Sequence, residues 1–230
     1  MKFDRLINLI TIDKYNKLSN SKILVVGVGG VGGYVCEMLA RCGVTTIGVV
    51  DSDVVSETNI NRQIIALTST LNISKVEVIK SRLKDINNDI NVIGYDIFID
   101  EANLHSLNLE TYDYVIDCID TVKSKLALIE YCVKNNIKII SSMGTGNKLD
   151  VTKFKICDIS KTHTCPLAKV VRYELRKRGI NHLKVLFSEE IPSNITKFEN
   201  GRNIPASFAP AVATAGIMIS ANVINEIIGE

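Results

Sequence analysis

Apolar residues occur along the chain in two alternating patterns. Short runs rich in β-branched residues, such as KILVVG and TTIGVV, are typical of strands buried on both faces of a sheet. Between them, apolar positions recur at helical spacing. We expect strands at residues 22–27, 45–50, 91–95, 112–116 and 137–142, and helices at residues 31–41, 74–86 and 122–135. This alternation predicts a Rossmann-like, doubly wound α/β fold with a mostly parallel sheet and flanking helices.

The rest of the chain adds to both ends of this core. We expect a helical lead-in at residues 1–21, strands at 151–157 and 183–188, and a helix at 166–178. Residues 190–208 are polar and contain Pro and Gly, which predicts a long loop. An apolar helix at 209–228 is expected to pack inside as a C-terminal helical extension. We therefore predict a single domain over residues 1–230, in which 1–146 bind a nucleotide and 147–230 face the substrate.

The composition of the chain argues against several classes of protein. The 230 residues are 46% hydrophobic and carry a net charge of +2, so the chain is neither disordered nor a general polyanion binder. Any contact with nucleic acid must be a local patch. No run of about 18 uniformly apolar residues and no signal peptide is recognised, so we expect no membrane contact and a cytoplasmic protein. The six cysteines form no C-x-x-C pair, which argues against a tetrahedral zinc site.

A glycine-rich loop follows the first predicted strand and opens the first helix of the alternating core. Its backbone N–H groups, at the helix N-terminus, can approach a phosphate, and the candidate positions are Gly27, Gly29, Gly30 and Gly32. Asp51 closes the second strand, where an acid can bind ribose hydroxyls. These features indicate a nucleotide, and NAD or FAD remains open at this point.

Further polar residues follow the ends of the predicted strands. A triphosphate needs more cations than a dinucleotide does, and an acid to hold Mg²⁺. Arg62 and Lys75 can supply the cations, and Asp120 can hold the metal. The loop lacks the G-x-x-x-x-G-K-[ST] pattern, which excludes a Walker-type ATPase. The carboxyl ends of parallel strands share one edge, so these residues are expected to gather there.

The segments GVGGVG, DSDVVSETNINRQ and DCIDT, together with Lys75, resemble the ATP-binding fold of the ubiquitin-activating-enzyme superfamily, which includes ThiF-type adenylyltransferases. The resemblance implies that a carboxylate is adenylylated by Mg-ATP. It implies ribose binding by Asp51 and a homodimer in which Arg5 is offered across the interface. It further implies nucleotide-binding or catalytic roles for the polar residues after the strands: Asn59, Arg62, Gln63, Lys75, Asp120 and Thr121.

Within that superfamily, the second half is similar to the tRNA threonylcarbamoyladenosine dehydratases, on the segments DISKTHTCPLAK, ELRKRGI and VLFSEE. This resemblance implies that the enzyme activates the threonyl carboxylate of a modified adenosine in the tRNA anticodon loop, and that loss of AMP closes a ring. Residues 203–208, before the last helix, contain no cysteine. A sulfur-transfer partner acting through that position is therefore not supported.

Basic residues cluster in the second half. On a helix starting near Pro166, Lys169, Arg172 and Arg176 share one face, and Lys161 lies just before it. This stripe can neutralise tRNA phosphates, although without the resemblance a solvated helix face is the better explanation. His163 and Cys165 could be read as a nucleophilic pair, but the expected dehydration needs no enzyme nucleophile.

Two other functions remain as alternatives. The first is an adenylyltransferase that activates the C-terminus of a small sulfur-carrier protein; the missing C-x-x-C pairs and the basic stripe count against it. The second is a nicotinamide-dependent oxidoreductase, which is disfavoured by the number of phosphate-directed charges.

Overall fold

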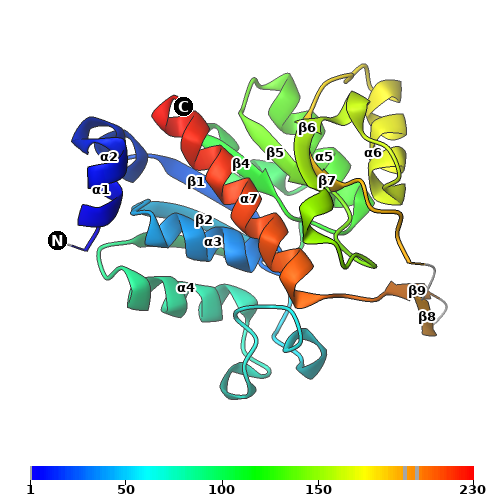
Figure 1. Cartoon of the computed structure of the whole chain (residues 1–230), viewed down its shortest axis with the longest axis horizontal. Helices are drawn as coiled ribbons and strands as arrows, with labels where there is room; N and C mark the ends of the chain where they lie inside the picture. The colour runs from blue at the N-terminus through cyan, green and yellow to red at the C-terminus, as the bar shows by residue number, and fades with distance from the viewer. Residues whose placement is uncertain (1, 194–195, 200–201) are drawn as a thin grey trace.

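The computed structural model describes residues 2–193, 196–199 and 202–230. Within this part of the chain, seven strands form one sheet in the order β3-β2-β1-β4-β5-β7-β6 (Figure 1). They are β1 (Lys22–Val26), β2 (Thr46–Asp51), β3 (Asn91–Asp96), β4 (Tyr114–Asp117), β5 (Ile139–Ser142), β6 (Phe154–Asp158) and β7 (Lys184–Ser188). β6 is antiparallel to β7, whereas the other neighbours pair in parallel. The predicted doubly wound, mostly parallel sheet is confirmed.

Helices cover both faces of the sheet. They are α1 (Asp4–Ile10), α2 (Ile12–Ser19), α3 (Gly32–Arg41), α4 (Lys75–Ile86), α5 (Val122–Lys134), α6 (Pro166–Lys177) and α7 (Ala209–Ile228). The apolar residues of α3, α4 and α7 pack in one core cluster, and those of α5 and α6 pack in a second. Helices on both faces explain why the central strands β1, β2, β4 and β5 read as continuous apolar runs, because both of their faces are buried. The edge strand β3 is largely exposed.

The last helix is the central element of the first core. α7 is long and apolar enough, by length and composition, to cross a membrane, but 56% of its most apolar window is buried inside the protein. It packs closely on α3: a Cβ added at Gly216 would lie 2.6 Å from the carbonyl oxygen of Val31. Glycine therefore allows the two helix backbones to approach. α7 is a core helix, as its composition predicted.

The expected loop at residues 190–208 is only partly correct. Within it, β8 (Thr196–Glu199) and β9 (Arg202–Pro205) pair in antiparallel fashion as a separate two-stranded sheet. The sequence places Asn-Gly between the two strands, and this dipeptide is a strong signal for a hairpin turn. The strand expected at residues 151–157 begins later, because a short 3₁₀ turn occupies Val151–Lys153 before β6.

Candidate nucleotide-binding site

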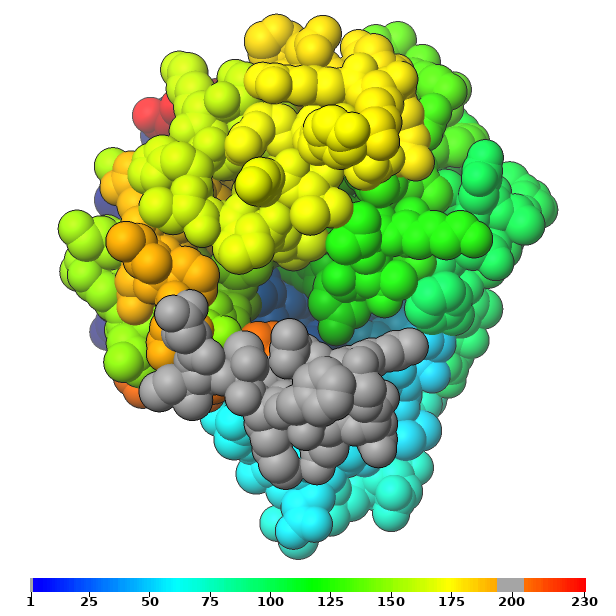
Figure 2. Space-filling model, turned by 90° about the vertical axis from the view of Figure 1, so that its right-hand side faces the viewer, coloured from blue at the N-terminus to red at the C-terminus, as the bar shows by residue number. Residues whose placement is uncertain are grey.

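Three strands end side by side at the edge of the sheet where the strand order reverses. Val26 of β1 is in register with Val50 of β2 on one side and with Asp117 of β4 on the other. In open α/β sheets this switch point is where ligands bind. Figure 2 looks onto this side of the molecule and shows a hollow with blue atoms of the glycine-loop region at its floor. Yellow segments of the second half and green segments of the first half form its upper rim.

The glycine loop packs closely against neighbouring backbone at Gly27 and Gly32 but is accessible at Gly29 and Gly30. A Cβ at Gly32 would lie 1.8 Å from the carbonyl oxygen of Gly27, and one at Gly27 would lie 2.8 Å from that of Cys118. By contrast, a Cβ at Gly29 would meet only the Gln63 Nε2 atom, at 3.8 Å, and one at Gly30 would meet Val212 at 3.4 Å. The backbone around Gly29 and Gly30 is therefore open to a phosphate group.

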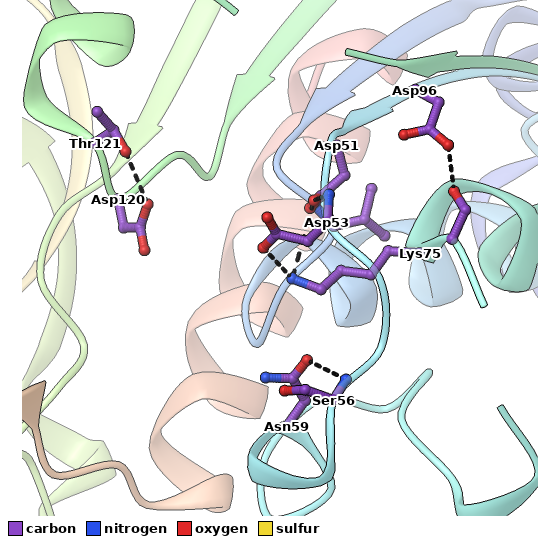
Figure 3. A network of polar contacts seen from close by, with 10 residues as sticks. Asp51, Asp53, Ser56, Asn59, Lys75, Asp96, Asp120 and Thr121 are labelled. Atoms are coloured by element: carbon purple, nitrogen blue, oxygen red, sulfur yellow. Dashed lines mark hydrogen bonds and ion pairs between the residues drawn. The ribbon is translucent and has the colours of Figure 1, made fainter. Parts of the chain in front are cut away.

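A buried lysine connects the loop after β2 to α4 (Figure 3). Lys75 begins α4, is 5% exposed, and its Nζ lies 2.7 Å from Asp53 Oδ2 and 3.9 Å from Asp51 Oδ1. Asp51 in turn accepts hydrogen bonds from the backbone N–H groups of Val28 (2.7 Å) and Asp53 (2.9 Å). Burial raises the pKa of Asp51 above its ordinary value, although Lys75 and the two N–H groups act in the opposite direction.

Asp51 thereby links the glycine loop to the end of β2. Its role as a nucleotide ligand remains a prediction, but its place beside the glycine loop is the one that this role requires. Asp53 is a residue that sequence reasoning missed. The available signal was its spacing, two positions after Asp51 at the end of a strand.

The segment after β2 holds three further predicted residues. Asn59 is buried, and its side-chain oxygen accepts from the backbone N–H of Ser56 at 3.1 Å. Arg62 is half-buried and donates through Nη1 to the carbonyl oxygen of Thr58 at 2.7 Å and to Asn61 Oδ1 at 2.8 Å. Gln63 is 7% exposed, and its buried Oε1 has no hydrogen-bond partner among the described residues. A ligand hydroxyl or amine would satisfy such an acceptor.

The candidate metal ligand stands on the opposite side of the close-up view. Asp120 and Thr121 follow β4, and in Figure 3 they lie apart from the group around Lys75. Both residues are exposed, and the Thr121 hydroxyl donates to Asp120 Oδ1 at 3.4 Å. The Asp120 carboxylate makes no ion pair in the described part of the chain. Beneath this loop lie two buried residues that sequence reasoning missed, Asp117 and Lys125.

Arg5 is remote from these residues in its own chain. It is exposed on α1, beside α2 and at the end of the molecule where β1 begins (Figure 1). The glycine loop lies at the other end of β1. The structure therefore does not bring Arg5 to the site of its own chain.

The donors at this edge of the sheet suit Mg-ATP. The accessible backbone N–H groups at Gly29 and Gly30 can bind phosphates. The buried Oε1 atom of Gln63 can accept a hydrogen bond from a ligand. The Asp120 carboxylate provides the hard oxygen ligand that Mg²⁺ prefers. Among the described residues, no three His, Cys, Asp or Glu side chains gather to hold a metal by themselves. A metal here would therefore take most of its ligands from water and phosphate oxygens.

The basic residues of the second half fall into two groups. Lys161, Lys169 and Arg176 are exposed. Arg172 is half-buried and donates through Nη1 to the carbonyl oxygen of Thr162 at 2.9 Å and also to its hydroxyl. Arg172 therefore fixes the start of α6 to the preceding turn as well as adding charge.

The residues of the THTC segment do not form an exposed nucleophilic pair. The Nε2 atom of His163 lies 3.3 Å from Glu189 Oε1, and its ring packs edge-on against Phe187. Cys165 is 3% exposed. The six cysteines are all free thiols in the structure.

A doubly wound sheet with an anion-binding loop at its switch point defines a nucleotide-binding α/β protein. The chain belongs to the ThiF family, whose sequence model matches residues 3–230.

Proteins similar to this chain point to one branch of the family. It is 42% identical over 224 residues to the tRNA threonylcarbamoyladenosine dehydratase of Bacillus subtilis (strain 168), an alignment that covers 92% of this chain and 88% of the relative. The crystal structure of the Escherichia coli tRNA N6-threonylcarbamoyladenosine dehydratase in complex with ATP matches with a TM-score of 0.91 at 31% identity, covering 99% of this chain and 94% of that one. The adenylyltransferase and sulfurtransferase UBA4 of Vanderwaltozyma polyspora is 36% identical over 141 residues, which cover 60% of this chain and 32% of the relative.

Proposed function

We propose that the protein is an ATP-dependent tRNA threonylcarbamoyladenosine dehydratase. One observation carries the proposal: the similarity to the Bacillus subtilis dehydratase runs through both halves of the chain, whereas the similarity to the UBA4 relative covers 60% of it. Both reactions need the nucleotide half, so the second half is what selects the substrate. The absence of C-x-x-C pairs from the sequence further disfavours the sulfur-carrier adenylyltransferase.

In the proposed reaction, ATP lies on the glycine loop with its phosphates against the backbone of Gly29 and Gly30. Asp51, exposed over a tenth of its side chain, accepts a hydrogen bond from a ribose hydroxyl. Lys75 and Arg62 stabilise the negative charge that develops on the phosphates. Mg²⁺ supplies further charge neutralisation when bound, and Asp120, with Thr121 beside it, would hold the ion together with phosphate oxygens.

The chemistry has two steps. An oxygen of the threonyl carboxylate attacks the α-phosphorus, the bond to the bridging oxygen breaks, and pyrophosphate leaves. The carbamoyl oxygen then attacks the activated acyl carbon, AMP leaves with the bonding electrons, and the carbamoyl nitrogen loses a proton. The nucleoside thereby loses the elements of water, with the oxygen retained in AMP. No enzyme nucleophile takes part, which agrees with the burial of Cys165.

The partner of the site is a tRNA that approaches through the second half. Lys161, Lys169 and Arg176 present charge to solvent and can neutralise phosphates of the anticodon stem and loop. We further propose a cytoplasmic homodimer in which Arg5 reaches the nucleotide of the neighbouring chain, because it lies far from the glycine loop of its own.

The test is incubation of the purified protein with Mg-ATP and tRNA carrying threonylcarbamoyladenosine. We expect AMP and pyrophosphate, and nucleoside mass spectrometry should show a product lighter by one water. Unmodified tRNA is the control and should support no turnover. Pyrophosphate release with unmodified tRNA, or with a small carrier protein ending in Gly-Gly, would contradict the proposal.

A further inference from the structure

A buried ion pair lies beneath the loop that carries Asp120. Lys125 of α5 and Asp117 at the end of β4 are both 0% exposed, and the Lys125 Nζ atom lies 2.7 Å from Asp117 Oδ2. The same ammonium group donates to Ser141 Oγ at 3.1 Å and to the carbonyl oxygen of Ser142 at 3.0 Å. The Ser141 hydroxyl donates to Asp117 Oδ2 at 2.5 Å. All three ammonium donors are therefore used.

Stability alone does not account for this pair. Desolvating two charges costs several kcal/mol per ion, and apolar residues of the same volume often stabilise a core equally well. A buried, fully satisfied ion pair does, however, hold the backbone groups around it in one arrangement. The position of the pair is informative, because it connects α5 and the carboxyl ends of β4 and β5 directly beside the switch point between β1 and β4.

The second carboxylate oxygen of Asp117 points into the loop. Asp117 Oδ1 accepts a hydrogen bond from the backbone N–H of Ile119 at 3.0 Å, which closes the turn that leads to Asp120. On its other side this turn touches the glycine loop. The N–H of Cys118 donates to the carbonyl oxygen of Val26 at 2.8 Å, and a Cβ at Gly27 would lie 2.8 Å from the carbonyl oxygen of Cys118.

We propose that Lys125 is a positioning residue of the nucleotide site. By fixing the Asp117 carboxylate, Lys125 sets the turn over residues 118–120 and thereby aims Asp120 at a metal ion bound to the triphosphate on the glycine loop. The inference rests on the proposed function, since it assigns Asp120 to the metal. It predicts that Lys125 governs the metal-dependent part of ATP affinity rather than ATP affinity as a whole.

The experiment measures the dissociation constant of ATP by calorimetry, once with excess Mg²⁺ and once with EDTA, in the full-length protein. The ratio of the two constants isolates the contribution of the metal. We expect Lys125→Met to reduce this ratio by about tenfold, equivalent to about 1.4 kcal/mol, while the constant in EDTA changes by less than about threefold. Arg82→Met is the matched control, because it removes a partner of the buried Glu37 away from the site and should leave the ratio unchanged.

A double-mutant cycle tests whether Lys125 acts through Asp120. We expect Asp120→Ala to reduce the ratio, and the Lys125→Met change to have no further effect in that background, because residues acting through one another are not additive. Full additivity, or an unchanged ratio in Lys125→Met, would overturn the inference. An unchanged ratio in Asp120→Ala would instead refute the metal assignment in the proposed function.

A milder variant decides the matter if Lys125→Met does not fold. Ser141→Ala removes one hydrogen bond to Asp117 and leaves the ion pair intact. We expect a smaller reduction of the ratio in the same direction, again absent in the Asp120→Ala background. An unchanged ratio in folded Ser141→Ala, measured beside a folded Arg82→Met control, would also overturn the inference.

Discussion

At the scale of single residues, Lys75 is the more deeply buried of the two cations expected to bind phosphate, Lys75 and Arg62. Its ammonium group is almost fully buried between the carboxylates of Asp51 and Asp53. The two acids hold its positive charge at the edge of the sheet where the glycine loop lies. This arrangement explains why Lys75, and not an exposed lysine of the same helix, is the residue to expect in the reaction.

Replacing Lys75 by Ala should lower the rate of AMP release on modified tRNA by about a hundredfold or more, because one electrostatic group of the transition state is lost. Lys80→Ala is the matched control. Lys80 lies on the same helix but is paired at the surface with Glu77, and such pairs contribute little. The rates are compared at saturating tRNA, with folding checked by circular dichroism. Turnover in Lys75→Ala equal to that of Lys80→Ala would show that Lys75 has no part in the reaction.

Asp51 should give the stability of the free protein a measurable pH dependence. Burial raises its pKa in the folded state, so the folded protein binds the proton more tightly than the unfolded chain does. Stability from this source is complete below the unfolded pKa of about 4 and is lost as the pH rises through the higher folded value. In Asp51→Asn this decline should be absent. Urea unfolding of both proteins at several pH values from about 4 to 7 measures it; parallel curves would contradict it.

At the scale of elements, the sequence predicted the alternating core best. Runs such as KILVVG could be assigned because both faces of β1 are covered, which leaves no polar position to blur the pattern. The pairing of β8 and β9 was missed because both strands are short and polar, so the only strong signal in the sequence was the Asn-Gly dipeptide between them.

Only part of the candidate site could be predicted from the sequence. Gly27 and Asp51 could be proposed because each stands at the end of a strand, and Lys75 because it opens the helix after the polar segment that follows β2. Lys125 could not, since it reads as one more polar position of a helix. Only the three-dimensional structure shows that it is turned inward onto Asp117.

The α6 helix carries a prediction that separates tRNA binding from ATP binding. Lys169→Glu and Arg176→Glu reverse exposed charges of this helix and should weaken tRNA binding by about tenfold or more together, with a shallower dependence on salt. The ATP dissociation constant should not change. Lys138→Glu is the control for each single reversal, because it makes the same charge change as either one on an exposed residue just before β5, at the opposite edge of the sheet. Filter binding at several salt concentrations measures the effect, and equal losses in the control would refute an α6 contact.

At the scale of the whole molecule, Arg5 is too far from the glycine loop of its own chain to contact a nucleotide there, so its predicted role requires a dimer. Within one chain, α1 lies at the end of the sheet where β1 begins, whereas the phosphate loop follows the other end of that strand. A symmetric dimer can place the α1 of each chain against the site of the other, because an isologous interface presents the same elements twice. Arg5 of one chain would then complete the nucleotide site whose other residues all belong to the second chain.

Complementation distinguishes this arrangement from a site built within one chain. Arg5→Ala and Lys75→Ala should each be inactive, but unfolding and refolding them together should restore activity. In a random mixture half of the dimers are mixed, and one of their two sites has both residues intact, so about a quarter of wild-type turnover is expected. If Arg5 serves its own chain, every site in the mixture lacks one residue and no activity returns. Size-exclusion chromatography with light scattering, on the same samples, establishes whether dimers form at all.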